Sequence, residues 1–127
     1  MHNPLETDYD LACERLSQDL GLKYFSEDWG LCNQDPARLG EFVEYFITRR
    51  DELSETEQGI LGELIMASAD KGLVRNPSFD LSSFRKFVKL TRDDPAQSDN
   101  FDLFGEDVGT PEDPTPLAAV IQAIMSR

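Results

Sequence analysis

The chain has 127 residues, with 25 acidic and 12 basic side chains, a formal net charge of −13 at pH 7 and a single His. A negative field of this size speeds encounter with basic partners and opposes direct binding to nucleic acid. With 39% hydrophobic residues the chain has enough apolar surface for a core, which argues against disorder of the whole chain and predicts a single domain over residues 1–127.

The sequence also carries information on compartment. No apolar run approaches the roughly 20 residues that span a bilayer, and the first residues lack the basic and apolar stretches of a signal peptide. We therefore expect a cytoplasmic protein with no membrane partner. Cys13 and Cys32 have no metal-ligand spacing and lie beside apolar residues, so both are predicted to be reduced, buried thiols.

Helix starts are marked three times by a capping residue followed by Pro, which suits the first helical position. The pairs are Asn3–Pro4, Asp35–Pro36 and Thr115–Pro116. After the first pair, apolar residues recur every three to four positions up to Leu20, and Gly21 follows, so a helix is predicted over about residues 4–20. Residues 22–33 are expected to be irregular or to contain a short turn of helix.

The second pair opens an amphipathic helix with an acidic outer face. Its apolar stripe consists of Leu39, Phe42, Val43, Phe46 and Ile47. A third helix begins with a capping box formed by Ser54 and Glu57, and is expected to end at Lys71–Gly72. A short connection predicts that these two helices form an antiparallel hairpin. Because Gly59 and Gly62 each cost a helix about 1 kcal/mol relative to Ala, we expect another backbone to approach them and the third helix to be central.

A fourth helix, capped by Asp80 or Ser82, carries the basic part of the chain. It is expected to bury Phe84, Phe87, Val88 and Thr91 and to expose Arg85, Lys86, Lys89 and Arg92. Segment 71–92 holds one acid and six bases between two acidic segments, which favours a solvated face that pairs with the acidic residues of 93–113. Phosphate contact is the alternative use of these bases.

Residues 93–114 are rich in Asp, Gly and Pro and are predicted to form a long acidic loop, pinned to the body by Phe101 and Phe104. A last helix over Leu117–Met125 has Gln122 as its one polar interior residue and is expected to be buried on most of its circumference. No segment shows convincing strand alternation. The predicted fold is therefore an all-α, single-domain bundle of about five helices, with a central helical hairpin and a long acidic loop before the C-terminal helix.

The sequence offers no nucleophile–base pair, metal constellation or phosphate loop, and its sole His is His2. We therefore expect a non-enzymatic protein with no cofactor and no metal. Segment 99–107 is acidic enough to suggest calcium, but Phe101 occupies the third position, where a calcium loop needs an oxygen ligand.

The run Asn100–Phe104 resembles the short apolar-acidic peptides by which bacterial proteins dock on the replication sliding clamp, with Asn100 where those motifs carry Gln. Packing of the two Phe side chains on the body is the simpler explanation of the same residues. The resemblance supports one alternative function, that of a regulatory adaptor docking through residues 99–107.

The acidic surface around the second helix is the predicted partner-binding site. Carboxylates accelerate association, and aromatic anchors supply affinity at the centre of an interface. The candidate residues are Glu27, Asp28, Trp29, Glu41, Glu44, Tyr45, Asp51, Glu52 and Glu55. Trp29 and Tyr45 are the candidate anchors. The competing interpretation places Trp29 in the core and gives the acids a role in solubility alone.

The stretches Asp28–Trp29, Asp35–Leu39, Glu41–Tyr45 and the capped helix Ser54–Gly72 resemble small acidic helical proteins of bacteria that act as immunity or antidote partners of toxins. The resemblance covers about residues 24–72. It implies a cytoplasmic protein that binds a basic toxin domain, often a nuclease, and blocks its active site or substrate channel. Our leading hypothesis is thus an immunity-type inhibitor of a basic toxin; a nucleic-acid mimic that occupies a DNA-binding groove is the other alternative to the adaptor.

Overall fold

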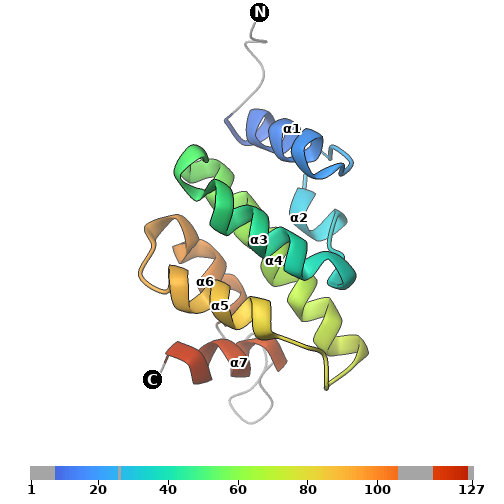
Figure 1. Ribbon diagram of the computed structural model, residues 1–127, viewed down its shortest axis with the longest axis vertical. Coiled ribbons are helices and arrows are strands. Elements are labelled where there is room, and N and C mark those ends of the chain that lie inside the picture. The colour runs from blue at the N-terminus through green and yellow to red at the C-terminus, as the bar shows by residue number, and fades with distance from the viewer. Residues whose placement is uncertain (1–7, 26, 106–115, 126–127) are drawn as a thin grey trace, which may run out of the picture.

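The computed structural model describes residues 8–25, 27–105 and 116–125, and within them it contains seven α-helices and no strands (Figure 1). The α-helices are α1 (Asp8–Leu20), α2 (Trp29–Cys32), α3 (Leu39–Arg49), α4 (Glu55–Arg75), α5 (Ser82–Thr91), α6 (Ser98–Gly105) and α7 (Pro116–Met125). Three 3₁₀ helices join them: η1 (Pro36–Arg38), η2 (Arg50–Glu52) and η3 (Pro95–Gln97). The all-α prediction is confirmed for the described residues, and the count of about five helices was too low.

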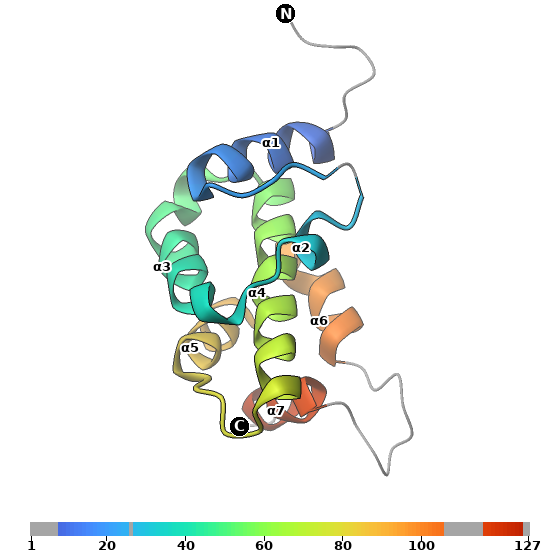
Figure 2. The ribbon, with the colours of Figure 1, turned by 90° about the vertical axis from the view of Figure 1, so that its right-hand side faces the viewer.

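Helix α4 is the central element, as predicted. It contacts each of the other six α-helices, which surround it in Figure 2. Its N-terminus is fixed by the expected capping box: the Glu57 amide donates to Ser54 Oγ at 3.1 Å, and the Ser54 amide donates to Glu57 Oε1 at 2.8 Å. Arg15 of α1 binds the same carboxylate, with 3.0 Å between Arg15 Nη1 and Glu57 Oε1.

The predicted end of this helix at Lys71–Gly72 is wrong, because α4 continues to Arg75. Gly72 does not stop the helix. It lies against the ring of Phe79, which a Cβ at position 72 would approach to 2.6 Å. Gly72 therefore allows close packing against the helix and does not mark the end of α4.

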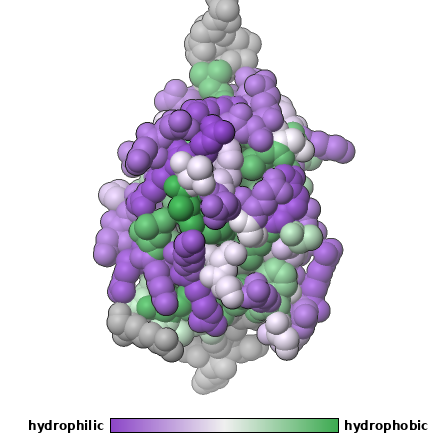
Figure 3. Space-filling view, in the orientation of Figure 1, coloured by the Kyte–Doolittle hydropathy of each residue, from purple (hydrophilic) through white to green (hydrophobic). Residues whose placement is uncertain are grey.

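Helices α3 and α4 form the predicted antiparallel hairpin, joined through η2 (Figures 1 and 2). The Asp35 side chain accepts a hydrogen bond from the Ala37 amide at 3.1 Å and so caps η1, which leads directly into α3. In the core, the rings of Phe46 (α3) and Phe87 (α5) meet edge to face with their centroids 5.1 Å apart. Hydrophilic side chains cover most of the face seen in Figure 3, with hydrophobic ones showing between them.

The predicted long loop at 93–114 is wrong in its first half, where η3 and α6 form. The Asp94 side chain accepts a hydrogen bond from the Ala96 amide at 3.0 Å. Asp94–Pro95 is therefore another capping residue followed by Pro at a helix start, a signal that the prediction of a loop did not use. Phe101 and Phe104 are partly buried against the core, as expected. Residues 106–115 lie outside the described residues.

The terminal helices depart from prediction in smaller ways. Helix α1 ends at Leu20 as expected, with Gly21 in the left-handed region at φ 65°; residues 4–7 of the predicted helix lie outside the described part of the chain. Helix α7 buries a single stripe and exposes Ala119, Gln122 and Ala123, so the prediction of burial on most of its circumference is wrong.

Both cysteines are free thiols. Cys13 is buried, as predicted, whereas Cys32 is exposed. The predicted cap of α5 at Asp80 or Ser82 is wrong, because Leu81 is the N-cap residue and makes no side-chain cap bond. The Asp80 side chain, one residue earlier, accepts a hydrogen bond from the Ser82 amide at 2.9 Å. None of the described helices is both long enough and apolar enough to cross a membrane.

Candidate functional site

The nine residues of the predicted acidic surface do not share one face. Glu41, Glu44 and Tyr45 lie on the outer side of α3, and Asp51 and Glu52 belong to η2. The other members of the set are Glu27, Asp28 and Trp29 at the start of α2, and Glu55 in the first turn of α4.

Trp29 cannot serve as an exposed anchor, which corrects the sequence-based assignment. Its side chain is 0% exposed, and its indole Nε1 donates to the Ser17 hydroxyl at 2.8 Å. The largest apolar side chain of the segment was drawn into the core because the short helix α2 packs directly on α4.

Basic side chains of the protein itself partly neutralise the α3 surface. Arg38 Nε lies 3.0 Å from Glu41 Oε1, and this bond holds the pKa of the Glu41 carboxyl below its usual range. At the end of the helix, Arg49 Nη1 lies 3.4 Å from Glu52 Oε2.

Tyr45, the other candidate anchor, is also engaged within the fold. Its hydroxyl donates to Asp19 Oδ2 at 2.7 Å, and burial raises the pKa of Tyr45 to about 12. The guanidinium of Arg49 stands 5.9 Å from the centre of its ring. The α3 surface is therefore less negative and less open to an aromatic contact than the sequence suggested.

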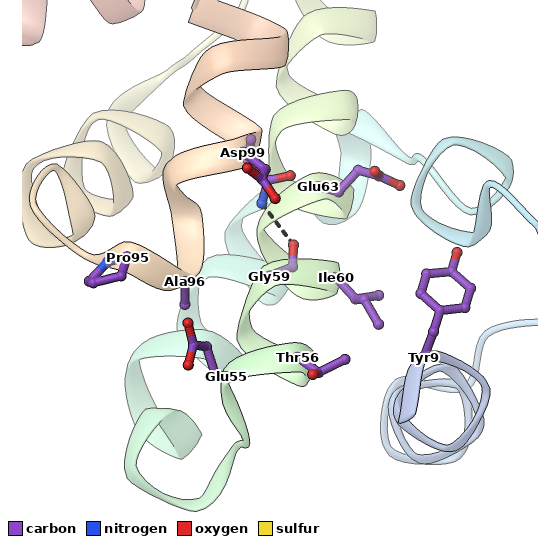
Figure 4. A pocket seen from close by; sticks show the side chains of 10 residues that line it. Tyr9, Glu55, Thr56, Gly59, Ile60, Glu63, Pro95, Ala96 and Asp99 are labelled. Carbon is purple, nitrogen blue, oxygen red and sulfur yellow. Dashed lines mark hydrogen bonds between the residues drawn. The ribbon is translucent and has the colours of Figure 1, made fainter. Parts of the chain in front are cut away.

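A cleft of about 400 Å³ lies on another side of the molecule, between α1 and the η3–α6 segment, with α4 as its floor (Figure 4). Its lining residues are Tyr9, Glu55, Thr56, Gly59, Ile60, Glu63, Pro95, Ala96, Asp99 and Asn100. Of the predicted site only Glu55 belongs to this lining. The cleft brings together α1, the N-terminal half of α4 and the η3–α6 segment, which are far apart in the sequence.

Two side-chain amides hold the α6 wall of the cleft. The amide of Gln97 donates to the Gln58 carbonyl at 2.7 Å, and that of Asn100 donates to the Gly59 carbonyl at 2.7 Å, the bond drawn in Figure 4. Asn100 Nδ2 also lies 2.8 Å from Gln97 Oε1. We call these three bonds the amide clasp.

The glycines of α4 make room for this contact. A Cβ at Gly59 would lie 3.1 Å from the Ala96 carbonyl oxygen, so the predicted backbone approach is confirmed there. At Gly62 the close neighbours are side chains instead, with Gln97 Oε1 at 1.8 Å from a Cβ placed at that position.

Tyr9 forms the opposite wall. Its hydroxyl accepts a hydrogen bond from the Trp29 amide at 3.3 Å, and burial raises the pKa of Tyr9 to about 12. In Figure 4 its ring stands across from Ile60, so the cleft has an apolar floor beside an aromatic wall.

The charge around the cleft is negative. Within the described residues, no salt bridge engages Glu55, Glu63 or Asp99. Glu55 and Asp99 lie in the first turns of α4 and α6. Each helix N-terminus carries a partial charge of about +0.5, which offsets only part of a full carboxylate charge.

Glu63 is the most buried of the three carboxylates. Burial raises the pKa of the Glu63 carboxyl, the negative charge of Asp28 raises it further, and a hydrogen bond from the Gly30 amide acts against both. A carboxylate with this pKa has lost solvation without gaining a cation. Glu63 and Asp99 were missed because the first sits among apolar positions of a central helix and the second lay in a presumed loop.

Asp99 and Asn100 are the part of the 99–107 segment that lines the cleft; the basic face of α5 and the rest of the clamp-like run take no part in it. Arg85, Lys86 and Lys89 are exposed on α5, and within the described chain none of them forms a salt bridge; Asp94 pairs instead with Arg50, with 3.0 Å between Nη2 and Oδ2. The clamp-like run lies in α6 and is therefore helical rather than extended. Within it, Asn100 is buried in the amide clasp and Leu103 is exposed. Among the described residues no group of three or more His, Cys, Asp or Glu side chains is placed to hold a metal ion.

The chain matches no protein-family model, no curated protein and no solved structure. Its resemblance to bacterial immunity proteins therefore rests on the sequence stretches that suggested it.

Proposed function

We propose that this chain is a non-enzymatic binding protein of the immunity type, which neutralises a basic protein such as a nuclease toxin domain through an acidic surface. The observation that carries the proposal is the cleft between α1 and α6, whose carboxylates Glu55, Glu63 and Asp99 have no basic partner among the described residues. Nuclease surfaces that bind phosphates are basic, so such a surface complements this cleft in charge.

The half-buried position of Glu63 strengthens its attraction for a cation, whereas Glu55 and Asp99 are exposed. Two unit charges 4 Å apart attract by about 1 kcal/mol in bulk water and by about 4 kcal/mol at the effective dielectric constant of a protein surface. A partner cation that reaches Glu63 would also relieve the unfavourable burial that raises the pKa of this carboxyl. The whole-molecule charge of −13 adds a long-range field that steers a basic partner to the protein.

The test is titration of the purified chain with purified basic nuclease toxin domains over a salt series, with nuclease activity as a second readout. We expect a stoichiometric complex, loss of nuclease activity, and an affinity that falls steeply as the Debye length shrinks from about 10 Å at 0.1 M salt to about 3 Å at 1 M. An affinity indifferent to ionic strength, or no complex at low salt, would overturn the proposal.

A further inference from the structure

We propose that the cleft between α1 and α6 takes an arginine side chain of the basic partner, with its stem against Ile60 and Tyr9 and its guanidinium facing the carboxylates of the rim. This inference rests on the proposed function and names the group that the surface recognises. It is carried by the shape of the cleft, its aromatic wall and its charge together.

The volume of the cleft sets the size of the occupant. One turn of an α-helix, about 10–12 Å wide and 5.4 Å long, fills roughly 400–600 Å³, whereas the whole cleft measures about 400 Å³. A single long side chain fits within this volume, with the partner's backbone lying across the mouth between α1 and α6.

The lining favours a side chain that is apolar along its stem and cationic at its tip. Ile60 and the ring of Tyr9 stand opposite each other with Glu63 nearby, and Glu55 and Asp99 line the cleft on the side of η3 and α6 (Figure 4). Lysine and arginine both have this character, because their aliphatic stems pack on apolar surface while their charged head groups remain in a polar environment.

Arginine fits better than lysine for two reasons. Its planar guanidinium stacks on aromatic rings, binds carboxylates through several donors and is more weakly hydrated than an ammonium group, so it enters a partly buried site at lower cost. The protein uses the same contact internally: the three cation–ring contacts of its described part all involve arginine, with Arg38 over Phe42, Arg49 over Tyr45 and Arg50 over Phe46.

The Tyr9 ring is held ready for such a contact. Its hydroxyl is bonded to the Trp29 amide at 3.3 Å, and the opposite wall is held by the amide clasp through Asn100. Since both walls are fixed before a ligand arrives, the protein loses little conformational entropy on binding.

The experiment compares two probes, the blocked peptides Gly-Arg-Gly and Gly-Lys-Gly, titrated into the isotopically labelled chain and followed by amide chemical shifts. We expect the arginine peptide to shift the amides of Tyr9, Gly59 and Ile60 and to bind about twofold to fivefold more tightly than the lysine peptide. Tyr9→Leu should abolish this preference, whereas Tyr9→Phe, which keeps the ring, should retain it.

The matched pair Glu63→Gln and Glu44→Gln localises the site, because each variant removes one charge and Glu44 lies on α3, away from the cleft. Glu63→Gln should weaken the arginine peptide severalfold more than Glu44→Gln does. Equal losses, equal affinity for the two peptides, shifts spread over the whole surface, or no binding of either peptide would overturn the inference. If the toxin titration still showed salt-sensitive binding, the proposed function would stand and only the arginine site would fall.

Discussion

Gly62→Ala is the sharpest test of how the cleft is built, because the structure places this glycine directly under the amide clasp. A Cβ at position 62 would lie 1.8 Å from Gln97 Oε1 and 2.8 Å from Asn100 Nδ2. Both amides are buried, at 0% and 7% exposure, so neither side chain can swing aside into solvent without giving up its hydrogen bonds.

The expected cost follows from the bonds that must break. The clasp comprises three hydrogen bonds, each worth about 1 kcal/mol net, so their loss costs about 3 kcal/mol. Replacing Gly by Ala inside a helix returns about 1 kcal/mol. Gly62→Ala should therefore lower the free energy of unfolding by about 2 kcal/mol, measured by urea denaturation.

Gly40→Ala is the matched control. Gly40 also lies in a helix, but its Cβ would meet only Ser83 Oγ, at an ordinary 3.5 Å. This variant should be stabilised by about 0.5–1 kcal/mol, the gain in helix propensity alone. If the clash is the cause, Gly62→Ala should also cost less in a Gln97→Ala background than alone. A Gly62→Ala protein as stable as the parent would refute the clasp.

Three further outcomes are expected. Phe46→Ala and Leu64→Ala, both at residues with 0% exposure, should each lower the free energy of unfolding by about 3–5 kcal/mol in urea denaturation. Glu41→Ala removes an exposed ion pair and should lower it by less than about 1 kcal/mol. The reverse order would contradict the assigned facing of α3 and α4. Glu63→Gln should stabilise the protein at neutral pH, because burial and Asp28 raise the pKa of this carboxyl and its ionised form therefore opposes folding. The gain should shrink as the pH falls through that pKa, where the native Glu63 carboxyl is already protonated; a gain that grew towards acid pH would show that the sign is wrong.

Local signals predicted much of the fold. The Ser54–Glu57 capping box and the Asp35–Pro36 pair mark backbone hydrogen bonds that form within a few residues, so the sequence contains everything needed to predict them. For residues that serve tertiary packing rather than local backbone geometry, the same signals gave wrong predictions. Gly72 has the appearance of a helix stop, but its role is to admit the ring of Phe79.

The site was harder to predict than the fold because it is made by tertiary contacts. Glu63 and Asp99 are 36 positions apart in the sequence and meet only because α6 is clasped to α4. Helix α6 was mistaken for a loop because of its composition, although Asp94–Pro95 carried the signal for the start of η3, which leads directly into α6. Trp29 was misassigned because burial by α4 is invisible in the sequence around it.

The most direct test of the central claim compares two charge-matched triple variants in binding to a basic nuclease toxin domain. One removes the cleft charges with Glu55→Gln, Glu63→Gln and Asp99→Asn; the other removes the same number from the α3–η2 surface with Glu41→Gln, Glu44→Gln and Glu52→Gln. Both leave the same net charge, so any difference reports the location of binding rather than the long-range field. We predict that the cleft variant loses at least about tenfold more affinity, or about 1.4 kcal/mol. Equal losses in the two variants, or a larger loss from the α3–η2 surface, would contradict the assignment of the cleft as the docking site.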